Sequence, residues 1–141
     1  MSTMLYEVAA FTHIGAVKEE QQDRVLVEST IIENGVHSFR PSGECRCFVA
    51  DGVGGAPAGW FAAEFVLSQI RLSVHFSDFP DRRVVVEKLR RINQGLISES
   101  SGDPEKQGCG TTLVGFVATA AHRTVVNSGA VSYTHLTLPT N

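Results

Sequence analysis

The feature that most constrains this chain is an apolar run that ends in an aspartate and a cluster of glycines, Phe48-Val49-Ala50-Asp51-Gly52-Val53-Gly54-Gly55. The run from Cys45 to Ala50 predicts a strand that enters a hydrophobic core. An aspartate at the tip of such a strand lies where a rigid sheet passes into a loop, a frequent position for a metal ligand or catalytic group. Glycines directly after it let the backbone turn tightly and let a ligand approach the main chain. Taken alone, the segment is more typical of an ordinary Asp-Gly turn, so the rest of the chain decides its meaning.

Hydrophobic periodicity predicts strands on both sides of two helices. Apolar residues recur at helical spacing from Ala58 to Val74 and again from Arg83 to Ser98. Asn34-Gly35 predicts a turn, followed by a loop as far as Gly43. The expected strands are Met4–Ala10, Arg24–Ile32, Cys45–Ala50, Thr111–Ala120 and Thr124–Asn127. A chain of 141 residues holds one domain at most, and this element order predicts an α+β layered fold.

Composition excludes several classes of function. Apolar residues make up 43% and charged residues 19% of the chain, and the formal net charge is −3. We therefore expect a globular protein with no nucleic-acid or membrane partner, and a monomer. The basic cluster between Arg82 and Arg91 is interrupted by apolar residues and predicts the solvated face of a helix.

No apolar run approaches the roughly 18 residues that span a bilayer, and the N-terminus lacks the features of a signal peptide. The three cysteines lack zinc-type spacing. Reduced thiols in a cytoplasmic protein are the simplest interpretation.

Other residues that often carry chemistry favour structural roles here. The segment from Gly108 to Thr112 is rich in glycine but lacks the Gly-Lys-Ser/Thr of a nucleotide-binding loop, so we expect it to open a strand. Cys109 has no neighbour that would activate it as a nucleophile. Four histidines have no metal-like spacing and predict surface or packing residues: His13, His37, His75 and His122.

Two further segments combine with the Asp51 motif. One is Thr12-His13-Ile14-Gly15-Ala16-Val17-Lys18-Glu19-Glu20-Gln21-Gln22-Asp23, and the other is Gly108-Cys109-Gly110-Thr111-Thr112-Leu113-Val114. In order and spacing, the three blocks resemble the N-terminal half of the metal-dependent (PPM-type) protein phosphatases, the protein phosphatase 2C family. That family shows Gly-x-x-Arg-x-x-Asn-Glu/Gln-Asp, a strand ending in Asp-Gly-x-Gly-Gly, two helices, and Gly-x-Gly-Thr-Thr opening a strand. The resemblance covers about Glu7 to Gly129, and it implies the N-terminal portion of an α-β-β-α sandwich.

The resemblance also implies a site with two Mg²⁺ or Mn²⁺ ions. Phosphate-ester hydrolysis needs a nucleophilic water and a clamp for negative oxygens, and two divalent ions supply both. Such hard cations select carboxylates, backbone carbonyls and waters. By motif, Asp51 would bridge the two metals and the carbonyl of Gly52 would bind one of them. Asp23 would contact the second metal, so Asp23 and Asp51 are the expected catalytic residues and should converge. Gln22 takes the place of the Glu or Gln beside the family's aspartate.

Three positions depart from the family or refine it. The arginine that holds the substrate phosphate aligns with Lys18, which keeps the charge but loses the bidentate fork. The family's asparagine aligns with Gln21. Val53 stands where bacterial members have Met or Val, so the motif is of the bacterial type.

The end of the chain carries a different signal. Val131 to Thr140 matches, residue for residue, the translation of the transposon mosaic-end adapter used in short-read sequencing libraries. Ala130 fits a hybrid codon at the junction, where the family continues with aspartate. We therefore expect residues 1–129 to be a partial phosphatase domain and residues 130–141 to be an adapter-derived tail that does not pack against it. The family's later Asp-Gly and Asp-Asn blocks, which supply further metal ligands, would then be absent.

The expected function is that of a bacterial-type, Mg²⁺/Mn²⁺-dependent phosphatase of phosphoserine and phosphothreonine proteins, inactive as this fragment. Its partners would be phosphorylated proteins and a serine/threonine kinase of the same pathway. One alternative is a phosphatase of the same fold that acts on an anti-sigma-factor antagonist. The other is a non-catalytic, phosphoprotein-binding regulator, which the Lys18 departure favours because regulatory members often lose the arginine.

Overall fold

The computed structural model describes residues 3–53 and 58–129. Their element order is strands, then helices, then strands, as the sequence predicts. The elements are β1 (Val8–Thr12), β2 (Asp23–Val27), β3 (Thr30–Ile32), β4 (Gly35–Phe39), β5 (Cys45–Asp51), α1 (Gly59–Ser73), the short 3-10 helix η1 (Phe76–Asp78), α2 (Arg82–Ser101), β6 (Leu113–Ala118) and β7 (Arg123–Ser128).

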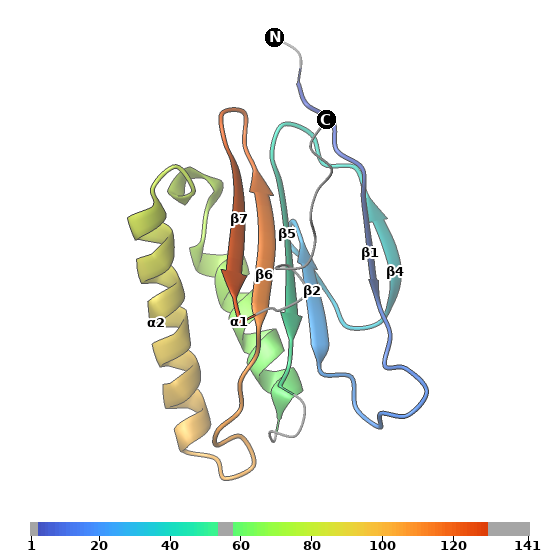
Figure 1. The fold of residues 1–141 in the computed structure, drawn as a ribbon, viewed down its shortest axis with the longest axis vertical. Helices are drawn as coiled ribbons and strands as arrows, with labels where there is room; N and C mark the ends of the chain where they lie inside the picture. The colour runs from blue at the N-terminus through green and yellow to red at the C-terminus, as the bar shows by residue number, and fades with distance from the viewer. Residues whose placement is uncertain (1–2, 54–57, 130–141) are drawn as a thin grey trace.

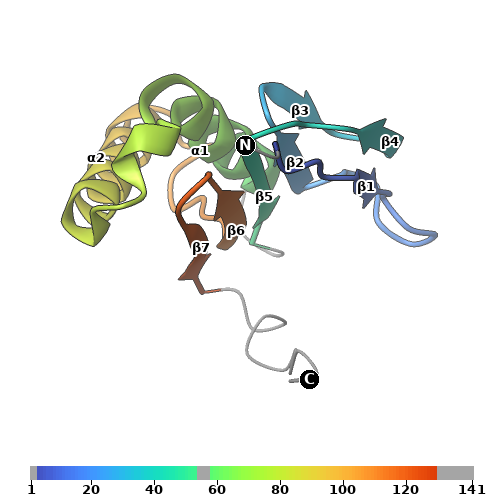
Figure 2. The same ribbon diagram turned by 90° about the horizontal axis from the view of Figure 1, so that it is seen from above.

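Two antiparallel sheets organise these elements. The larger has five strands in the order β3-β2-β5-β6-β7, and the smaller is a ribbon of β1 and β4. Both helices cover the same face of the five-stranded sheet, and the ribbon stands beside its β2 side (Figures 1 and 2). β5 is the central strand, so the residues at its end are supported by neighbours on both sides.

The main core lies between the helices and the five-stranded sheet. Phe48 on β5 is 1% exposed and packs in one cluster with α1 and α2. It lies opposite Gly115 of β6, where an added Cβ would come within 2.2 Å of the Phe48 ring. A second, smaller cluster fills the space between the ribbon and the other face of the sheet, and it contains Ala10, Val25, Val27 and Ile32. β2 and β5 are therefore clamped from both faces, which fixes where their ends lie.

The helices form where the apolar periodicity predicts them, with small differences at the ends. α2 starts one residue earlier than expected, because the Asp81 carboxylate accepts a hydrogen bond from the Arg83 backbone N–H at 2.8 Å. It continues to Ser101, through serines that the sequence pattern assigns to a loop. α1 begins after Ala58, which adopts a left-handed conformation with φ of 53°.

The N-terminal strands differ most from expectation. Arg24–Ile32, expected as one strand, is a two-strand hairpin that turns at Glu28 and Ser29. Glu28 takes a φ of 54°, and its carboxylate accepts a hydrogen bond from the Arg46 backbone N–H at 2.9 Å, which holds the turn without glycine or asparagine. Gly35–Phe39, expected as a loop, is β4, and the first strand is shifted toward Thr12 because it pairs with β4.

Candidate functional site

Asp23 and Asp51 lie directly opposite one another. Asp23 is the first residue of β2, Asp51 is the last residue of β5, and the antiparallel register pairs them. Directly opposed residues carry their side chains on the same face of the sheet, with Cβ atoms about 4.5–5.5 Å apart. The two carboxylates, 28 positions apart in the sequence, therefore converge as expected, while their role as metal ligands stays a prediction.

Gly52 is placed where no larger residue fits. Its backbone N–H donates to the carbonyl of Gln22 at 3.2 Å. A Cβ at this position would lie 2.5 Å from the backbone of Gly59 and 2.7 Å from the Gln22 carbonyl oxygen. The start of α1 therefore packs on the backbone at the end of β5. This contact explains on structural grounds why a glycine follows Asp51, in addition to the proposed role of its carbonyl as a metal ligand.

The segment from Gly108 to Thr112 forms hydrogen bonds with the same end of β5. The backbone N–H of Thr112 donates to the Asp51 carbonyl at 2.9 Å, and the N–H of Val53 donates to the Gly110 carbonyl at 2.9 Å. Gly52 and Thr111 form an isolated antiparallel bridge. The segment opens β6, as the sequence predicts, and it also locks the backbone on both sides of Gly52.

The environment of Asp23 opposes its negative charge. Burial raises the pKa of Asp23 above its ordinary value of 3.8, and the hydrogen bond and repulsion from Asp51 raise it further, while Lys18 and Arg24 lower it in part. Two carboxylates share a hydrogen bond only when one is protonated, so the pair disfavours full ionisation. An acid whose pKa is raised in the folded state stabilises the fold below its unfolded pKa and loses that contribution as the pH rises through the folded value. At neutral pH the pair therefore costs stability, as expected of groups that are kept for a ligand.

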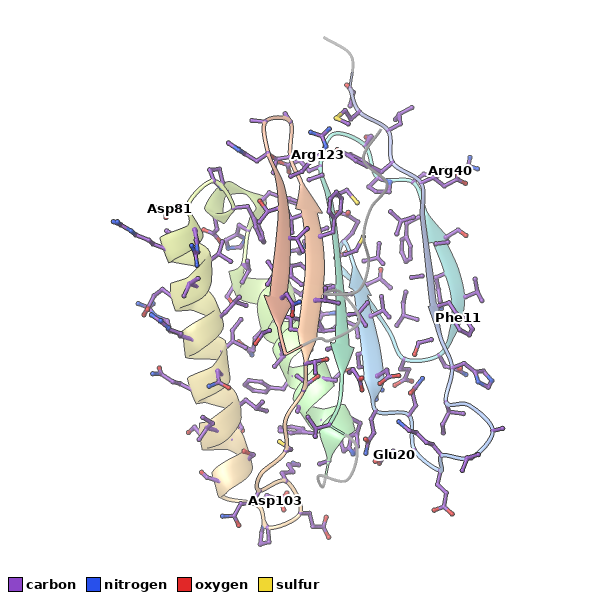
Figure 3. All side chains as sticks on the ribbon, in the orientation of Figure 1. Phe11, Glu20, Arg40, Asp81, Asp103 and Arg123 are labelled. Atoms are coloured by element: carbon purple, nitrogen blue, oxygen red, sulfur yellow. The ribbon has the colours of Figure 1, made fainter. Side chains whose placement is uncertain are left out.

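Lys18 reaches this end of the molecule from an exposed loop. Its charge is close enough to act on the pKa of Asp23. Glu20, labelled in Figure 3, lies in the same loop just before β2 begins. The structure thus brings a cation to the aspartate pair, and the contact of Lys18 with a phosphate stays a prediction.

The residues present fit part of a site for a hard divalent cation. The Oδ1 atom of Asp23 is buried and finds no hydrogen-bond partner among the described residues. A buried carboxylate oxygen without a donor is costly, and a cation would satisfy it. Within residues 3–53 and 58–129, however, no group of three or more His, Cys, Asp or Glu side chains is gathered as a metal site. Asp23, Asp51 and the Gly52 carbonyl therefore represent an incomplete ligand set.

Two other residues, neither of them among the expected site residues, belong to the site's framework. Arg24 is 7% exposed and donates to the carbonyl of Asp23 at 2.9 Å. Its signal was a single charge inside the apolar strand that follows Asp23. Gln21, aligned with the family's asparagine, instead braces the loop: its Nε2 donates to Thr12 Oγ1 at 2.7 Å, and its Oε1 accepts from the Asp23 N–H at 3.3 Å.

The cysteines described are free thiols, with Cys45 Sγ and Cys47 Sγ 3.9 Å apart, and burial raises the pKa of Cys45 to about 12. Cys109 borders an apolar cavity of about 210 Å³ between α2 and β6.

In the described ranges, no helix has the length and apolar character to cross a membrane. The expected adapter-derived tail, 130–141, lies outside the described residues.

No family model matches this sequence, and no curated protein matches it. Solved structures do. The serine/threonine phosphatase PstP/Ppp of Mycobacterium tuberculosis is similar over 89% of this chain and 47% of its own, with a TM-score of 0.63 and 21% identity. The catalytic domain of PstP in complex with two manganese ions is similar over 89% and 48%, with a TM-score of 0.59 and 20% identity. The serine/threonine phosphatase Stp1 of Staphylococcus aureus is similar over 85% and 44%, with a TM-score of 0.57 and 16% identity.

These similarities establish the fold. The chain has an α+β fold that corresponds to the N-terminal portion of the bacterial serine/threonine phosphatase fold, which confirms the expected architecture. It spans about half the length of the solved structures that it matches.

Proposed function

We propose that this chain is the N-terminal part of a PPM-type, metal-dependent phosphatase of phosphoserine and phosphothreonine proteins. The observation that carries the proposal is the pairing of Asp23 with Asp51 at adjacent strand ends, in a fold shared with bacterial serine/threonine phosphatases. The likeness to a phosphatase domain in complex with two manganese ions supports a binuclear Mg²⁺ or Mn²⁺ centre. Phosphorylated proteins would be its substrates, and a serine/threonine kinase of the same pathway its counterpart.

Each residue of the site would have a distinct part. Asp51 and the Gly52 carbonyl would hold the metals from β5, and Asp23 would hold the second metal from β2. When bound, the two ions supply a nucleophilic water and neutralise phosphate oxygens. Lys18 would attract the substrate phosphate as a point charge from the exposed loop. The buried, donor-free Oδ1 of Asp23 supports the assignment, because a carboxylate in that position is preorganised for a cation.

The fragment itself should be inactive. Two carboxylates and one carbonyl are too few ligands to hold two hydrated dications. We further propose that residues 1–129 belong to the phosphatase domain, while residues 130–141 are derived from a sequencing adapter. The native gene would then continue beyond Gly129 with the remaining metal-binding aspartates.

The test is phosphatase activity with controlled metal. The gene completed from the original reads should hydrolyse p-nitrophenyl phosphate and phosphothreonine peptides with Mn²⁺, and EDTA should abolish the activity because the nucleophilic water depends on the metals. The 141-residue chain, assayed alongside, should show none. Hydrolysis that survives EDTA would overturn the mechanism. No hydrolysis under any metal, with the later aspartates present, would favour the phosphoprotein-binding regulator.

Lys18 offers a more specific expectation. In the completed enzyme, Lys18→Arg should lower the KM for a phosphopeptide by about fivefold, because a guanidinium fork adds a second charge-assisted hydrogen bond to a phosphate. Steady-state kinetics at saturating Mn²⁺ measures this. Lys88→Arg is the matched control, since Lys88 is engaged by Asp78 and the Ser73 carbonyl. An unchanged KM in Lys18→Arg would remove Lys18 from the phosphate site.

A further inference from the structure

Arg24 is a buried charge placed next to a proposed metal ligand. It follows Asp23 in β2, is 7% exposed, and shares its strand with the fully buried Leu26 and Val27. Side chains alternate along a strand, so Arg24 points to the face opposite Asp23. There its Nε lies 3.0 Å from Glu64 Oε2 of α1. A buried arginine is costly unless its donors are used, so its contacts indicate what it is kept for.

Those contacts converge on the backbone that carries Asp23. Nη1 of Arg24 donates to the Gln21 carbonyl at 3.0 Å and to the Asp23 carbonyl at 2.9 Å. The carbonyl between them, that of Gln22, accepts from the Gly52 N–H at 3.2 Å. Three consecutive carbonyls are therefore held, and the middle bond joins the segment directly to the residue after Asp51. These bonds fix the backbone of Asp23 relative to Gly52.

The other side of the guanidinium is anchored outside the strand. Glu64 holds Nε from α1, and Glu33 lies 3.6 Å from Nη2. α1 also packs its first residue, Gly59, against Gly52. The same helix thus supports both strand ends: β5 by backbone packing, and β2 through the Arg24–Glu64 pair.

We propose that Arg24, held by Glu64, is a positioning residue for the proposed metal site: it fixes the backbone of Asp23 relative to Asp51 and Gly52. The inference rests on the proposed function, and it assigns to Arg24 no contact with metal or substrate. Arginine is required because its planar fork serves two carbonyls and a carboxylate at once, which a lysine ammonium on a flexible stem cannot do.

Geometry and charge make opposite predictions here, which sharpens the test. At a pH where both aspartates are ionised, a positive charge beside them repels a dication, so if charge were its only effect, removing Arg24 would tighten metal binding. If Arg24 positions Asp23, removing it weakens metal binding. Arg24→Lys keeps the charge and loses the fork, so it isolates the geometric part.

Arg46 provides a matched control. It is also a partly buried arginine on the central sheet that ties a strand to α1, with Nε donating to the Glu28 carbonyl at 2.9 Å and Nη1 to the Val74 carbonyl at 2.7 Å. These contacts lie at the opposite end of β5 from Asp51. Arg46→Lys should lower stability as Arg24→Lys does, without touching the aspartates.

The experiment measures Mn²⁺ binding to the completed protein by titration with electron paramagnetic resonance detection, with the melting temperature of each metal-free variant measured alongside. Arg24→Lys and Arg24→Met should each raise the Mn²⁺ dissociation constant by roughly 10- to 100-fold, the range found when partners of metal ligands are removed. Glu64→Gln should raise it less, and it serves if the Arg24 variants fail to fold. Arg46→Lys should leave it within about threefold of the wild type, since distant sites act independently.

Three outcomes would overturn the inference. Unchanged or tighter Mn²⁺ binding in the Arg24 variants would mean that charge, not position, is what Arg24 contributes. An equal loss in Arg46→Lys would reduce the effect to general stability. Wild-type protein that binds no Mn²⁺ would instead overturn the proposed function, which separates the two failures.

Discussion

Replacing Gly52 by alanine is expected to destabilise the domain by about 3 kcal/mol or more, beyond the usual cost of overpacking. The added methyl would lie 2.5 Å from the backbone carbon and oxygen of Gly59 and 2.7 Å from the Gln22 carbonyl oxygen. These neighbours are main-chain atoms of a helix start and of a strand-end segment, so none can rotate away as a side chain would. Relief would require α1 to move off β5, which would open the core around Phe48. Urea denaturation of the Gly52→Ala variant measures the loss.

Gly102→Ala is the control for that substitution. Gly102 follows α2 with φ of −84°, and nothing lies within 4 Å of its would-be Cβ. Alanine there should leave stability unchanged or raise it slightly, because it restricts the unfolded chain. If the Gly52→Ala variant were as stable as the Gly102→Ala variant, the close packing of α1 against Gly52 would be contradicted. The expected difference in stability would show that packing alone requires a glycine after Asp51, whether or not a metal binds there.

The elements predicted correctly are those whose signal is local. β5 is a mostly apolar strand closed by a turn motif, and α1 and α2 bury apolar faces that repeat over four or more turns. Such periodicity depends on which face meets the core, and one sequence displays it directly. Their order sufficed for the α+β class.

The elements missed depend on partners that are distant in sequence. The hairpin turn at Glu28 has no glycine or asparagine, and it is held by Arg46, 18 positions later. β4 is exposed along its three middle residues, and it forms because β1 supplies its hydrogen bonds. Neither interaction is visible in the local pattern, because strand pairing is a tertiary interaction that overrides propensity.

The candidate site divides in the same way. Asp23 and Asp51 could be singled out because motif order carries them, but their direct opposition is a matter of register, which only the paired strands define. The close approach of Gly59 to Gly52 and the grip of Arg24 on two carbonyls are three-dimensional contacts. In the sequence these contacts correspond only to a glycine at the start of a helix and a charge in an apolar strand. Both patterns occur for many other structural reasons, so neither predicts the contact.

In the completed enzyme, Asp51→Asn is expected to lower kcat by about a hundred- to a thousandfold, the scale seen when a charge-stabilising group is lost from a reaction centre. Asparagine keeps the shape of the side chain and removes the negative charge that a bridging metal ligand needs. The fold should tolerate the change, because the Asp51 backbone is held by its pairing with Asp23 and by the Thr112 N–H. Hydrolysis of p-nitrophenyl phosphate over a range of Mn²⁺ concentrations measures the loss.

The same substitution should raise the melting temperature of the metal-free protein, and this opposite sign is what makes it diagnostic. Burial and Asp51 together raise the pKa of Asp23, so above the unfolded pKa of that carboxyl the folded state is destabilised by holding it beside Asp51. Asparagine removes the repulsion between the two carboxylates and can donate a hydrogen bond to Asp23, and sites held for function commonly gain stability when they are disabled. Glu99→Gln, the same charge change on the exposed side of α2, should alter neither activity nor melting temperature. Lost activity with a lower melting temperature would make Asp51 a structural residue. Full activity would remove Asp51 from the metal centre. Lost activity with a higher melting temperature is the result expected of a carboxylate that is kept for a cation.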